Sequence, residues 1–305
     1  MRVVFMGTPE YATSILEALL GWDECQVVGV FTQPDKPAGR NKLLKPPHVK
    51  ECLLNGHPLI PLFQPSSLKL PEIQETLRAL SPDVIVVAAY GQLLPQSVLD
   101  IAPCINLHAS LLPRYRGASP IQAALLAGDA YTGVTAMLMD KGLDTGAMIG
   151  YAYLSLDPHI KAPEVFEALA ACAATLTLRT LQQLDAVFPL PQHNALASYA
   201  PKISKAQGIV DFSSSSTVLC RKFQALTPWP GLWLSSGLKL LELCVESSTG
   251  GYQPGEILAL DKEGAVIGCS QGSVRVCYVQ APSKKPLHVK DYLAGKRSGV
   301  GALLS

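Results

Sequence analysis

The sequence lacks the features that place a chain in a membrane or in an oxidising compartment. It contains no apolar run of the roughly 20 residues that a transmembrane helix needs. The segment Met1 to Leu20 is interrupted by Gly7, Pro9 and Glu10, so we expect neither a signal peptide nor a membrane span. The 8 cysteines form no CxxC pair and no Cys/His cluster, which leaves no zinc or redox motif. We therefore expect a cytoplasmic protein with reduced, mostly buried thiols.

A strong net charge is also missing, because 25 Lys and Arg are balanced by 24 Asp and Glu. The balance is uneven along the chain: residues 1–204 hold 14 basic and 17 acidic side chains, whereas residues 205–305 hold 11 and 7. The C-terminal part is therefore basic, which suits a solvated surface as well as a nucleic-acid-binding one. A length of 305 residues with 48% apolar composition predicts about two packed domains.

No GxGxxG motif follows a predicted strand, so the sequence does not predict a nicotinamide site. Short apolar runs nevertheless alternate with helical patterns, which is typical of an α/β domain with a doubly wound, mostly parallel sheet. After the first run we expect Thr8 to cap a helix whose first turn contains Pro9. Strands are predicted over Val3–Met6, Gln26–Thr32, Pro58–Phe63, Asp83–Ala89, Gly133–Met139 and Ala147–Leu156, and helices over Leu70–Leu80, Ala123–Gly128 and Ala162–Leu184.

The C-terminal part has a different pattern. A helix capped within Ser213–Ser216 precedes a rigid Thr227–Gly231 turn. Five short strand patterns follow, which predict a small OB-like β-barrel, a scaffold that often binds nucleic acid. We expect a domain at 1–186, a linker at 187–206 and a smaller domain at 207–305. The five strands are predicted over Leu232–Leu234, Lys239–Val245, Gly255–Leu260, Ala265–Cys269 and Ser273–Tyr278.

Polar residues gather at the expected exits of two strands. Asn106 and His108 are two apart in an apolar stretch, so they can project from one face of a strand. Asp144 lies in a later turn between Gly142 and Gly146, which permit a tight backbone. These side chains could form an acyl-transfer site at the carboxyl edge of the sheet. A lone histidine near an apolar strand is, however, more often structural than catalytic.

The motifs around these residues resemble the folate-dependent formyltransferase family. NLHASLLP, YRGASPIQ and GLDTG carry the resemblance, and YAPKISKAQG and FQALTPWPG extend it to the C-terminal part. The resemblance implies a Rossmann-like formyltransferase fold and formyl transfer from 10-formyltetrahydrofolate. By residue-for-residue match it implies that the catalytic positions are Asn106, His108 and Asp144.

A basic segment at Pro34–Lys50, PDKPAGRNKLLKPPHVK, interrupts the α/β pattern, and its prolines and Gly39 argue against a regular element. Such a segment is by itself often only a solvated loop. It resembles, however, the loop that contacts the tRNA acceptor stem in the branch of the family acting on methionyl initiator tRNA. The resemblance implies a role in translation initiation and four tRNA-binding residues, Lys36, Arg40, Lys42 and Lys45.

The resemblance also implies a folate pocket lined mainly by backbone groups. A planar pterin with several donors and acceptors suits main-chain pairing, although an ordinary strand-to-helix turn explains the same residues. The residues implied in folate binding are Gln92, Leu93, Leu94, Ser110, Leu111, Leu112, Pro113 and Asp140.

Formyl transfer to an amine needs stabilisation of an oxyanion and a route for protons. Asn106 can supply an amide donor, His108 can donate or relay a proton, and Asp144 can orient the imidazole. The reaction requires no metal, and no ligand cluster suggests one. Arg114 and Arg116 could clamp an anion, or one could pair internally and hold the loop.

Three functions stay open at this point. The first is transfer of the formyl group to methionine on initiator tRNA by an enzyme that we expect to be monomeric. The second keeps the chemistry but uses a small amine, or water in a 10-formyltetrahydrofolate hydrolase. The third is a catalytically silent RNA-binding protein, which the combination of Asn106, His108 and Asp144 disfavours.

Overall fold

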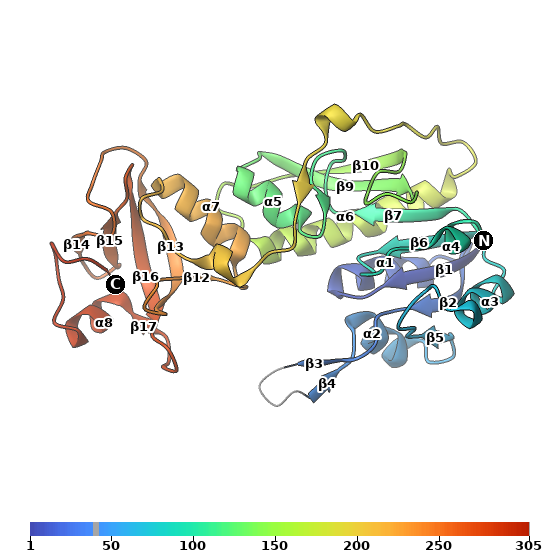
Figure 1. Ribbon diagram of the computed structural model, residues 1–305, viewed down its shortest axis with the longest axis horizontal. Coiled ribbons are helices and arrows are strands. Elements are labelled where there is room, and N and C mark those ends of the chain that lie inside the picture. Colours follow the sequence, from blue (N-terminus) through green and yellow to red (C-terminus); the bar gives the residue numbers. More distant parts are fainter. Residues whose placement is uncertain (39–42, 305) are drawn as a thin grey trace. The chain divides into compact units, whose positions relative to one another are not determined.

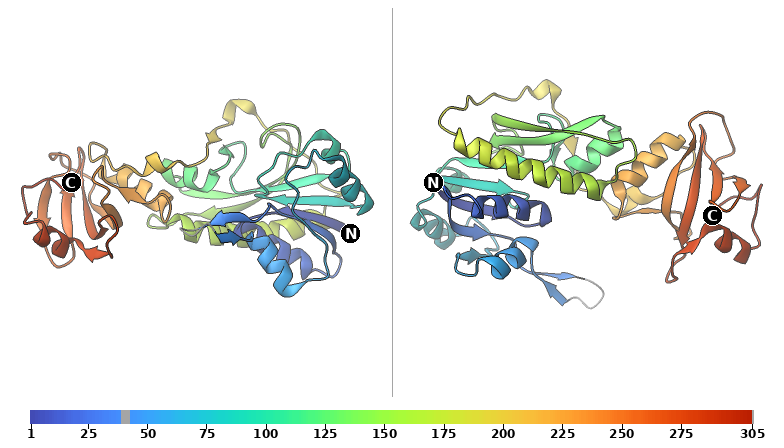
Figure 2. Two further views of the ribbon diagram at one scale, coloured as in Figure 1. Left: turned by 60° about the horizontal axis from the view of Figure 1, so that its bottom comes forward. Right: turned by 180° about the vertical axis from the view of Figure 1, so that it is seen from behind.

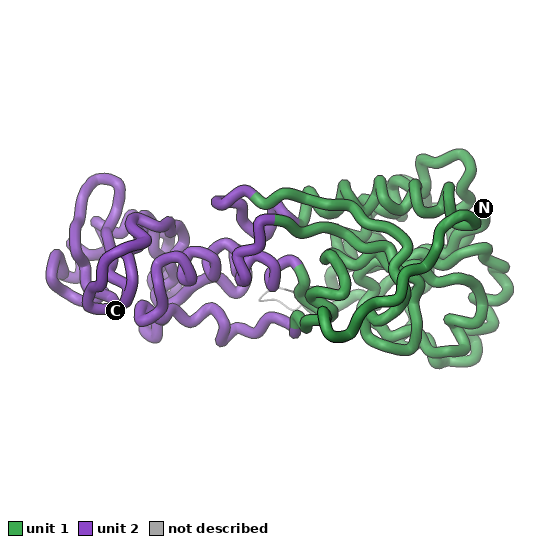
Figure 3. The backbone as a smooth tube through the Cα atoms, turned by 90° about the horizontal axis from the view of Figure 1, so that it is seen from above, with its two compact units in different colours: residues 1–120, 131–156, 166–200 green, residues 121–130, 157–165, 201–305 purple. Residues whose placement is uncertain are grey.

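The computed structural model describes residues 1–38 and 43–304 of the chain. These residues form two compact units (Figure 3). The first unit comprises residues 1–120, 131–156 and 166–200, and the second comprises residues 121–130, 157–165 and 201–305. The eight cysteines are all free thiols, but only Cys104, Cys220 and Cys269 are buried, so the expectation that most of them are buried is wrong. No helix in the described part of the chain is both long and apolar enough to span a membrane.

The first unit is built on a seven-stranded sheet with the order β10-β9-β7-β6-β1-β2-β5 (Figure 1). The pairings from β5 through β2, β1 and β6 to β7 are parallel, whereas β9 runs antiparallel to both β7 and β10. The prediction of a mostly parallel sheet is confirmed. The strands are β1 (Arg2–Gly7), β2 (Gln26–Phe31), β5 (Leu62–Phe63), β6 (Val84–Ala88), β7 (Cys104–His108), β9 (Tyr131–Leu138) and β10 (Met148–Ser155).

Helices cover both faces of this sheet because its central strands are apolar on both sides. Residues Val3 to Met6 of β1 are fully buried although successive side chains point to opposite faces. Figure 2 shows α1 and α6 along one face. On the other face, Leu77 of α3 and Val98 of α4 join one apolar cluster with Val4 and Cys104. The helices are α1 (Glu10–Leu20), α2 (His48–Gly56), α3 (Pro71–Ala79), α4 (Gln96–Leu99) and α6 (Ala162–Gln182).

Two local predictions in the N-terminal half are wrong. Thr8 does not cap α1, because its hydroxyl donates instead to the carbonyl of Tyr90, and Pro9 is the N-cap. The basic segment is not wholly irregular: β3 (Lys36–Ala38) pairs with β4 (Leu43–Lys45), and α2 begins at its end. Two strands of three residues suffice here because each satisfies the polar backbone of the other.

The second unit contains a six-stranded antiparallel sheet with the order β12-β13-β16-β15-β14, to which β17 is added beside β16. The five predicted strands and the helix before them are present. Pairings within the described residues do not close the sheet into the expected barrel, because β12 and β14 remain its two ends. The strands are β12 (Leu232–Trp233), β13 (Lys239–Ser247), β14 (Ile257–Leu260), β15 (Ala265–Gly268), β16 (Ser273–Gln280) and β17 (Leu287–His288).

Three helices accompany these strands. Helix α7 (Ser216–Leu226) is capped by Ser215, whose hydroxyl accepts from the Val218 amide, as the Ser213–Ser216 prediction requires. Helix α5 (Pro120–Ala127) overlaps the predicted Ala123–Gly128 segment but begins three residues earlier. Helix α8 (Val289–Gly295) was not predicted, since its 7 residues are too short for a periodic signal.

Candidate active site

Strand β7 positions Asn106 and His108 at the carboxyl edge of the parallel strands. Asn106 is paired with Val87 of β6 on one side and with Met137 of β9 on the other, and His108 is paired with Thr135. Both side chains share the face of Cys104, as predicted from the alternation along a strand. Asn106 is 9% exposed and His108 is 7% exposed, so both polar side chains are largely buried.

The imidazole of His108 has a different neighbour on each nitrogen. Its Nε2 lies 2.9 Å from the carbonyl oxygen of Tyr115, and its Nδ1 lies 3.7 Å from Oδ2 of Asp144. A carbonyl can only accept, so Nε2 carries a hydrogen and donates it. Nδ1 is therefore the nitrogen whose protonation decides the charge of the ring, and a carboxylate faces it.

Asp144 is held by a strained and tightly bonded turn. Its φ of 55° lies in the left-handed region, which residues with a side chain rarely adopt. Its Oδ2 accepts a hydrogen bond of 2.8 Å from the Gly117 amide, which aims the carboxylate towards His108. A Cβ at Gly146 would collide with the carbonyl of Leu138, so the turn requires glycine there, as the sequence predicts.

The carboxamide of Asn106 has no hydrogen-bond partner among the described residues. Buried amides are nearly always hydrogen-bonded in folded proteins. An unpartnered amide beside His108 is therefore a donor and acceptor available to a bound molecule. Sequence, strand geometry and hydrogen bonding agree in bringing Asn106, His108 and Asp144 to one edge of the sheet.

The hydroxyl of Thr135 in β9 bonds the segment after β7 at two points. Thr135 Oγ1 donates to the Ser110 carbonyl at 2.7 Å and accepts from the Leu112 amide at 3.0 Å. Ser110 Oγ donates to the Arg114 carbonyl at 2.7 Å, so its hydroxyl stabilises the turn and is not activated as a nucleophile. These bonds fix the position of Tyr115, whose backbone carbonyl contacts His108. Because the backbone makes this contact, the side-chain type of Tyr115 does not predict it.

Most side chains of the predicted folate set are engaged within the protein. Gln92 bonds to the backbone of Pro65 and Leu68, and Asp140 accepts from Gly142 and Thr145 in the turn before Asp144. Ser110, Leu94 and Leu112 are buried, Leu111 and Pro113 are partly buried, and Leu93 is 73% exposed. Folate binding by this set, through main-chain groups, stays a prediction.

The predicted tRNA-binding residues fall into two groups. Lys36 and Lys45 pair across the β3–β4 hairpin and are both exposed. Arg40 and Lys42 lie outside the described residues. Lys50, at the base of the same segment, instead forms a 2.8 Å ion pair with Asp35 and also donates to Gln64.

Arg116 resolves one alternative that the sequence left open. It is 3% exposed, and its guanidinium donates to Gln192 at 3.0 and 2.8 Å and to Asn194 at 3.0 Å. It therefore holds the loop. Arg114 donates to the hydroxyl of Tyr115 and lies over that ring at 4.7 Å. Gln192 was not predicted, because it lies in a proline-rich stretch that carries no motif.

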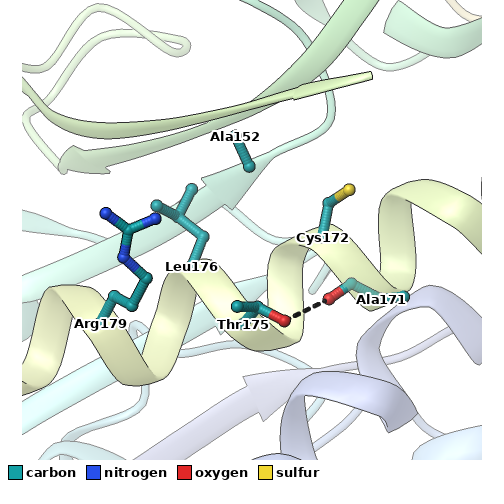
Figure 4. A pocket seen from close by; sticks show the side chains of 6 residues that line it. All are labelled: Ala152, Ala171, Cys172, Thr175, Leu176 and Arg179. Carbon is teal, nitrogen blue, oxygen red and sulfur yellow. Dashed lines mark hydrogen bonds between the residues drawn. The ribbon is translucent and has the colours of Figure 1, made fainter. Parts of the chain in front are cut away.

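A cavity of about 290 Å³ lies between β10 and α6 (Figure 4). Its wall is mostly apolar, with Ala152, Leu176 and the stem of Arg179. Thr175 is already bonded to the Ala171 carbonyl. This cavity contains none of the residues that the sequence predicts to be catalytic. In the described part of the chain no group of three or more His, Cys, Asp or Glu residues could hold a metal ion.

Comparison with known families assigns both parts of the chain. Residues 1–181 match the formyl transferase family, and residues 202–297 match the formyl transferase C-terminal domain. The chain is 52% identical over 301 residues to a methionyl-tRNA formyltransferase of Nitratiruptor sp., covering 99% of each chain. It is 47% identical over 307 residues to that of Helicobacter pylori, covering 100% of each.

The chain belongs to the methionyl-tRNA formyltransferase family. The family resemblance seen in the sequence is thereby confirmed.

Solved structures agree on the fold of this formyltransferase family member. A N-formyltransferase from Helicobacter canadensis, in complex with folinic acid and dTDP-3-aminofucose, has a TM-score of 0.67 at 17% identity, covering 90% of this chain and 98% of that one. HypX from Aquifex aeolicus, in complex with tetrahydrofolic acid, has a TM-score of 0.64 at 19% identity and covers 98% of this chain. This chain spans 48% of the length of HypX, about half.

Proposed function

We propose that this chain transfers the formyl group of 10-formyltetrahydrofolate to the α-amine of methionine on initiator tRNA. The observation that carries the chemistry is the buried, unpartnered carboxamide of Asn106 beside His108, whose Nδ1 lies 3.7 Å from Asp144. The acceptor is supported by relatives that are 46–52% identical over nearly the whole chain and are named for methionyl-tRNA.

The reaction proceeds by direct attack. The neutral amine of methionine bonds to the formyl carbon, the formyl oxygen becomes an oxyanion, and the bond from the carbon to the folate nitrogen then breaks. The amine loses one proton and the departing folate nitrogen gains one, so the step balances without an oxidant or a covalent enzyme intermediate.

Each of the three side chains has one part in this step. Asn106 donates its amide hydrogen to the oxyanion, and a donor of this kind contributes about 10²–10³ in rate. His108 is the proton carrier, a role worth about 10²–10⁴. Asp144 faces Nδ1 and keeps the orientation of the ring. The carboxamide of Asn106 lacks a partner in the described chain, so it is free to bond the formyl oxygen of a bound folate.

Folate and tRNA are bound by different parts of the chain. We assign the pterin to main-chain groups of the loops holding Gln92–Leu94, Ser110–Pro113 and Asp140, and the acceptor stem to Lys36, Arg40, Lys42 and Lys45. The catalytic domain is residues 1–186 and the tRNA-binding domain residues 207–305, in a cytoplasmic monomer. Light scattering of the purified chain tests the monomer.

The deciding experiment measures formyl transfer from 10-formyltetrahydrofolate to three acceptors: methionyl initiator tRNA, methionyl elongator tRNA and a small amine. We expect transfer to the initiator, strongly reduced in His108→Ala. Transfer to the small amine alone would keep the chemistry and replace the acceptor. Release of formate with no transfer would indicate a hydrolase, and no reaction with any acceptor would leave an RNA-binding protein.

A further inference from the structure

Gln192 links the catalytic turn to a buried arginine. Its Nε2 donates to two main-chain carbonyls of the turn, that of Asp144 at 2.9 Å and that of Gly146 at 2.8 Å. Its Oε1 accepts both the Nε and the Nη2 hydrogens of Arg116, at 3.0 and 2.8 Å. The carboxamide of Gln192 thus donates to the turn through its nitrogen and accepts from the guanidinium of Arg116 through its oxygen.

These bonds belong to a hydrogen-bond network that also includes the carboxylate of Asp144. Gly117, the neighbour of Arg116 in β8 (Arg116–Gly117), donates its amide to Asp144 Oδ2 at 2.8 Å. Asp144 is therefore held at its carbonyl through Gln192 and at its carboxylate by Gly117. The two restraints act on opposite ends of one residue, so together they set the direction of the carboxylate towards His108.

The segment that carries Gln192 is itself fixed on both sides. Leu190 exchanges two backbone hydrogen bonds with Met148 of β10, at 2.8 and 2.9 Å. Strand β11 (Tyr199–Ala200) pairs in parallel with β8. Gln192 therefore approaches the turn from a rigid support, which is what a side chain needs in order to position another group.

Asp144 adopts an uncommon backbone conformation that these hydrogen bonds support. Asp144 has a φ of 55°, which costs about 1–3 kcal/mol in a residue other than glycine and persists only where its surroundings impose it. Arg116 is 97% buried, given its exposure of 3%, and no carboxylate in the described ranges pairs with it. A buried charge held only by neutral amides costs stability, and such costs are usually associated with function.

We propose that Arg116 and Gln192 form a positioning pair that acts through Asp144 to orient His108. The inference rests on the proposed function for its kinetic test, although the geometry does not depend on which amine accepts the formyl group. Neither residue contacts the reacting atoms in this scheme. Their loss changes the rate of the chemical step rather than the binding of either substrate.

The test variant is Gln192→Glu. The carboxylate can still accept both hydrogens of Arg116, so the buried charge keeps its partner and the fold is retained, but it cannot donate to the carbonyls of Asp144 and Gly146. We expect kcat to fall about 10- to 100-fold, with KM for folate and for tRNA little changed, because small misplacement of a catalytic group has effects of this size. Gln192→Met, which removes both sets of bonds, repeats the test without the added charge.

The matched control is Asn194→Ala. Asn194 is exposed and bonds Arg116 through the same Nη2 that also reaches Gln192, but it has no bond to the turn. We expect activity close to that of the unmodified chain. A loss in Asn194→Ala equal to that in Gln192→Glu would indicate a general structural effect and overturn the inference.

A double variant separates positioning from other roles. In an Asp144→Asn background, Gln192→Glu should add little further loss, because the group that it positions is already altered. Losses that multiply would mean that Gln192 acts independently of Asp144, which would also overturn the inference.

A spectroscopic measurement tests the positioning of His108 without relying on formyl transfer. The ¹⁵N resonance of His108 Nδ1, assigned by its absence in His108→Ala, should shift in Gln192→Glu and stay in place in Asn194→Ala. If the unmodified chain formylates no methionyl-tRNA, the proposed function fails and this resonance still decides the inference. An unchanged resonance in Gln192→Glu overturns it in either case.

Discussion

Nδ1 of His108 lies 3.7 Å from Oδ2 of Asp144, beyond the reach of a hydrogen bond, although both side chains are largely buried. The same carboxylate oxygen is 2.8 Å from the amide of Gly117, which holds it in place. An approach of about 0.5–1 Å brings the pair to hydrogen-bond distance. A carboxylate therefore faces Nδ1 of His108 at a distance that a small movement would convert into a hydrogen bond.

The charge of Asp144 should matter more than its shape. Asp144→Asn can still accept from the Gly117 amide, but it no longer presents a negative charge to Nδ1 of His108. We expect kcat to fall by about 10²–10⁴ with little change in KM, as for loss of an acid–base partner. Steady-state kinetics test this, with unfolding curves as the control for folding. A loss confined to KM would place Asp144 in binding instead.

Asn106→Ala should separate activity from stability. The carboxamide has no hydrogen-bond partner in the described protein, so its removal breaks no side-chain hydrogen bond of the fold. Its removal should lower kcat about 10²–10³-fold while changing the free energy of unfolding little. Chemical denaturation and formyl transfer are measured on the same preparation. Clear destabilisation would mean that the amide supports the fold and is not reserved for a substrate.

Lys36 and Lys45 of the basic segment should contribute to tRNA binding through their charge, unlike Lys50. Lys36→Ala and Lys45→Ala remove exposed cations from the hairpin, so each should raise KM for tRNA and lower the slope of log affinity against log salt by about 1. KM for folate should stay the same. Lys69→Ala, an exposed lysine in another loop, is the matched control. An equal effect in Lys69→Ala would indicate non-specific charge attraction.

Lys50→Ala should instead lower thermal stability. Lys50 pairs with Asp35, and hydrogen bonds from Gln64 and then Lys50 hold the pKa of that carboxyl below its ordinary value. The loss should disturb the base of the hairpin and change tRNA binding only indirectly. A lower melting temperature with a salt slope like that of the unmodified chain is the expected result, and a normal melting temperature would contradict it.

The second unit offers a test of pH dependence. Arg275 bonds to Glu246 and Asp261, and these side-chain hydrogen bonds lower the pKa of both carboxyls. A carboxyl whose pKa is lower in the folded state stabilises the fold above its unfolded pKa, and that contribution is lost as pH falls through the folded pKa. Arg275→Met should therefore lower the urea midpoint at neutral pH, and the difference should shrink below about pH 4.

Lys262→Met, in the same turn as Asp261, serves as the control for that measurement. It should change the midpoint little at any pH. A deficit in Arg275→Met that is the same at pH 3 and pH 7 would mean that lost packing, rather than the two ion pairs, accounts for the change.

The strand and site predictions came from features that are local in the chain. Val84–Ala88 and Cys104–His108 are apolar runs bounded by breakers, and a buried parallel strand needs little else. The spacing of Asn106 and His108 fixes their shared face through the period of a strand. The glycine at Gly146 marked the tight turn that presents Asp144.

Other features depended on partners far away in the sequence. Thr8 is a good capping residue by type, but its hydroxyl donates to the carbonyl of Tyr90, which is 82 residues away. The five strand patterns of the C-terminal part predicted a barrel, yet closure depends on whether the end strands meet, and β12 and β14 do not pair. The local propensities of residues predict neither the bond of Thr8 nor the closure of the sheet, because both depend on long-range pairing.

The sequence by itself determined the family, the α/β order of the N-terminal half and the residue types at the site, because motifs and periodicity are properties of neighbouring residues. Tertiary structure alone decided that Arg116 supports the loop, that Lys50 is bound to Asp35, and that Gln192, 48 residues from Asp144, holds the catalytic turn. Hydrogen bonds between distant segments form only when the whole chain has packed, and no local pattern encodes their geometry.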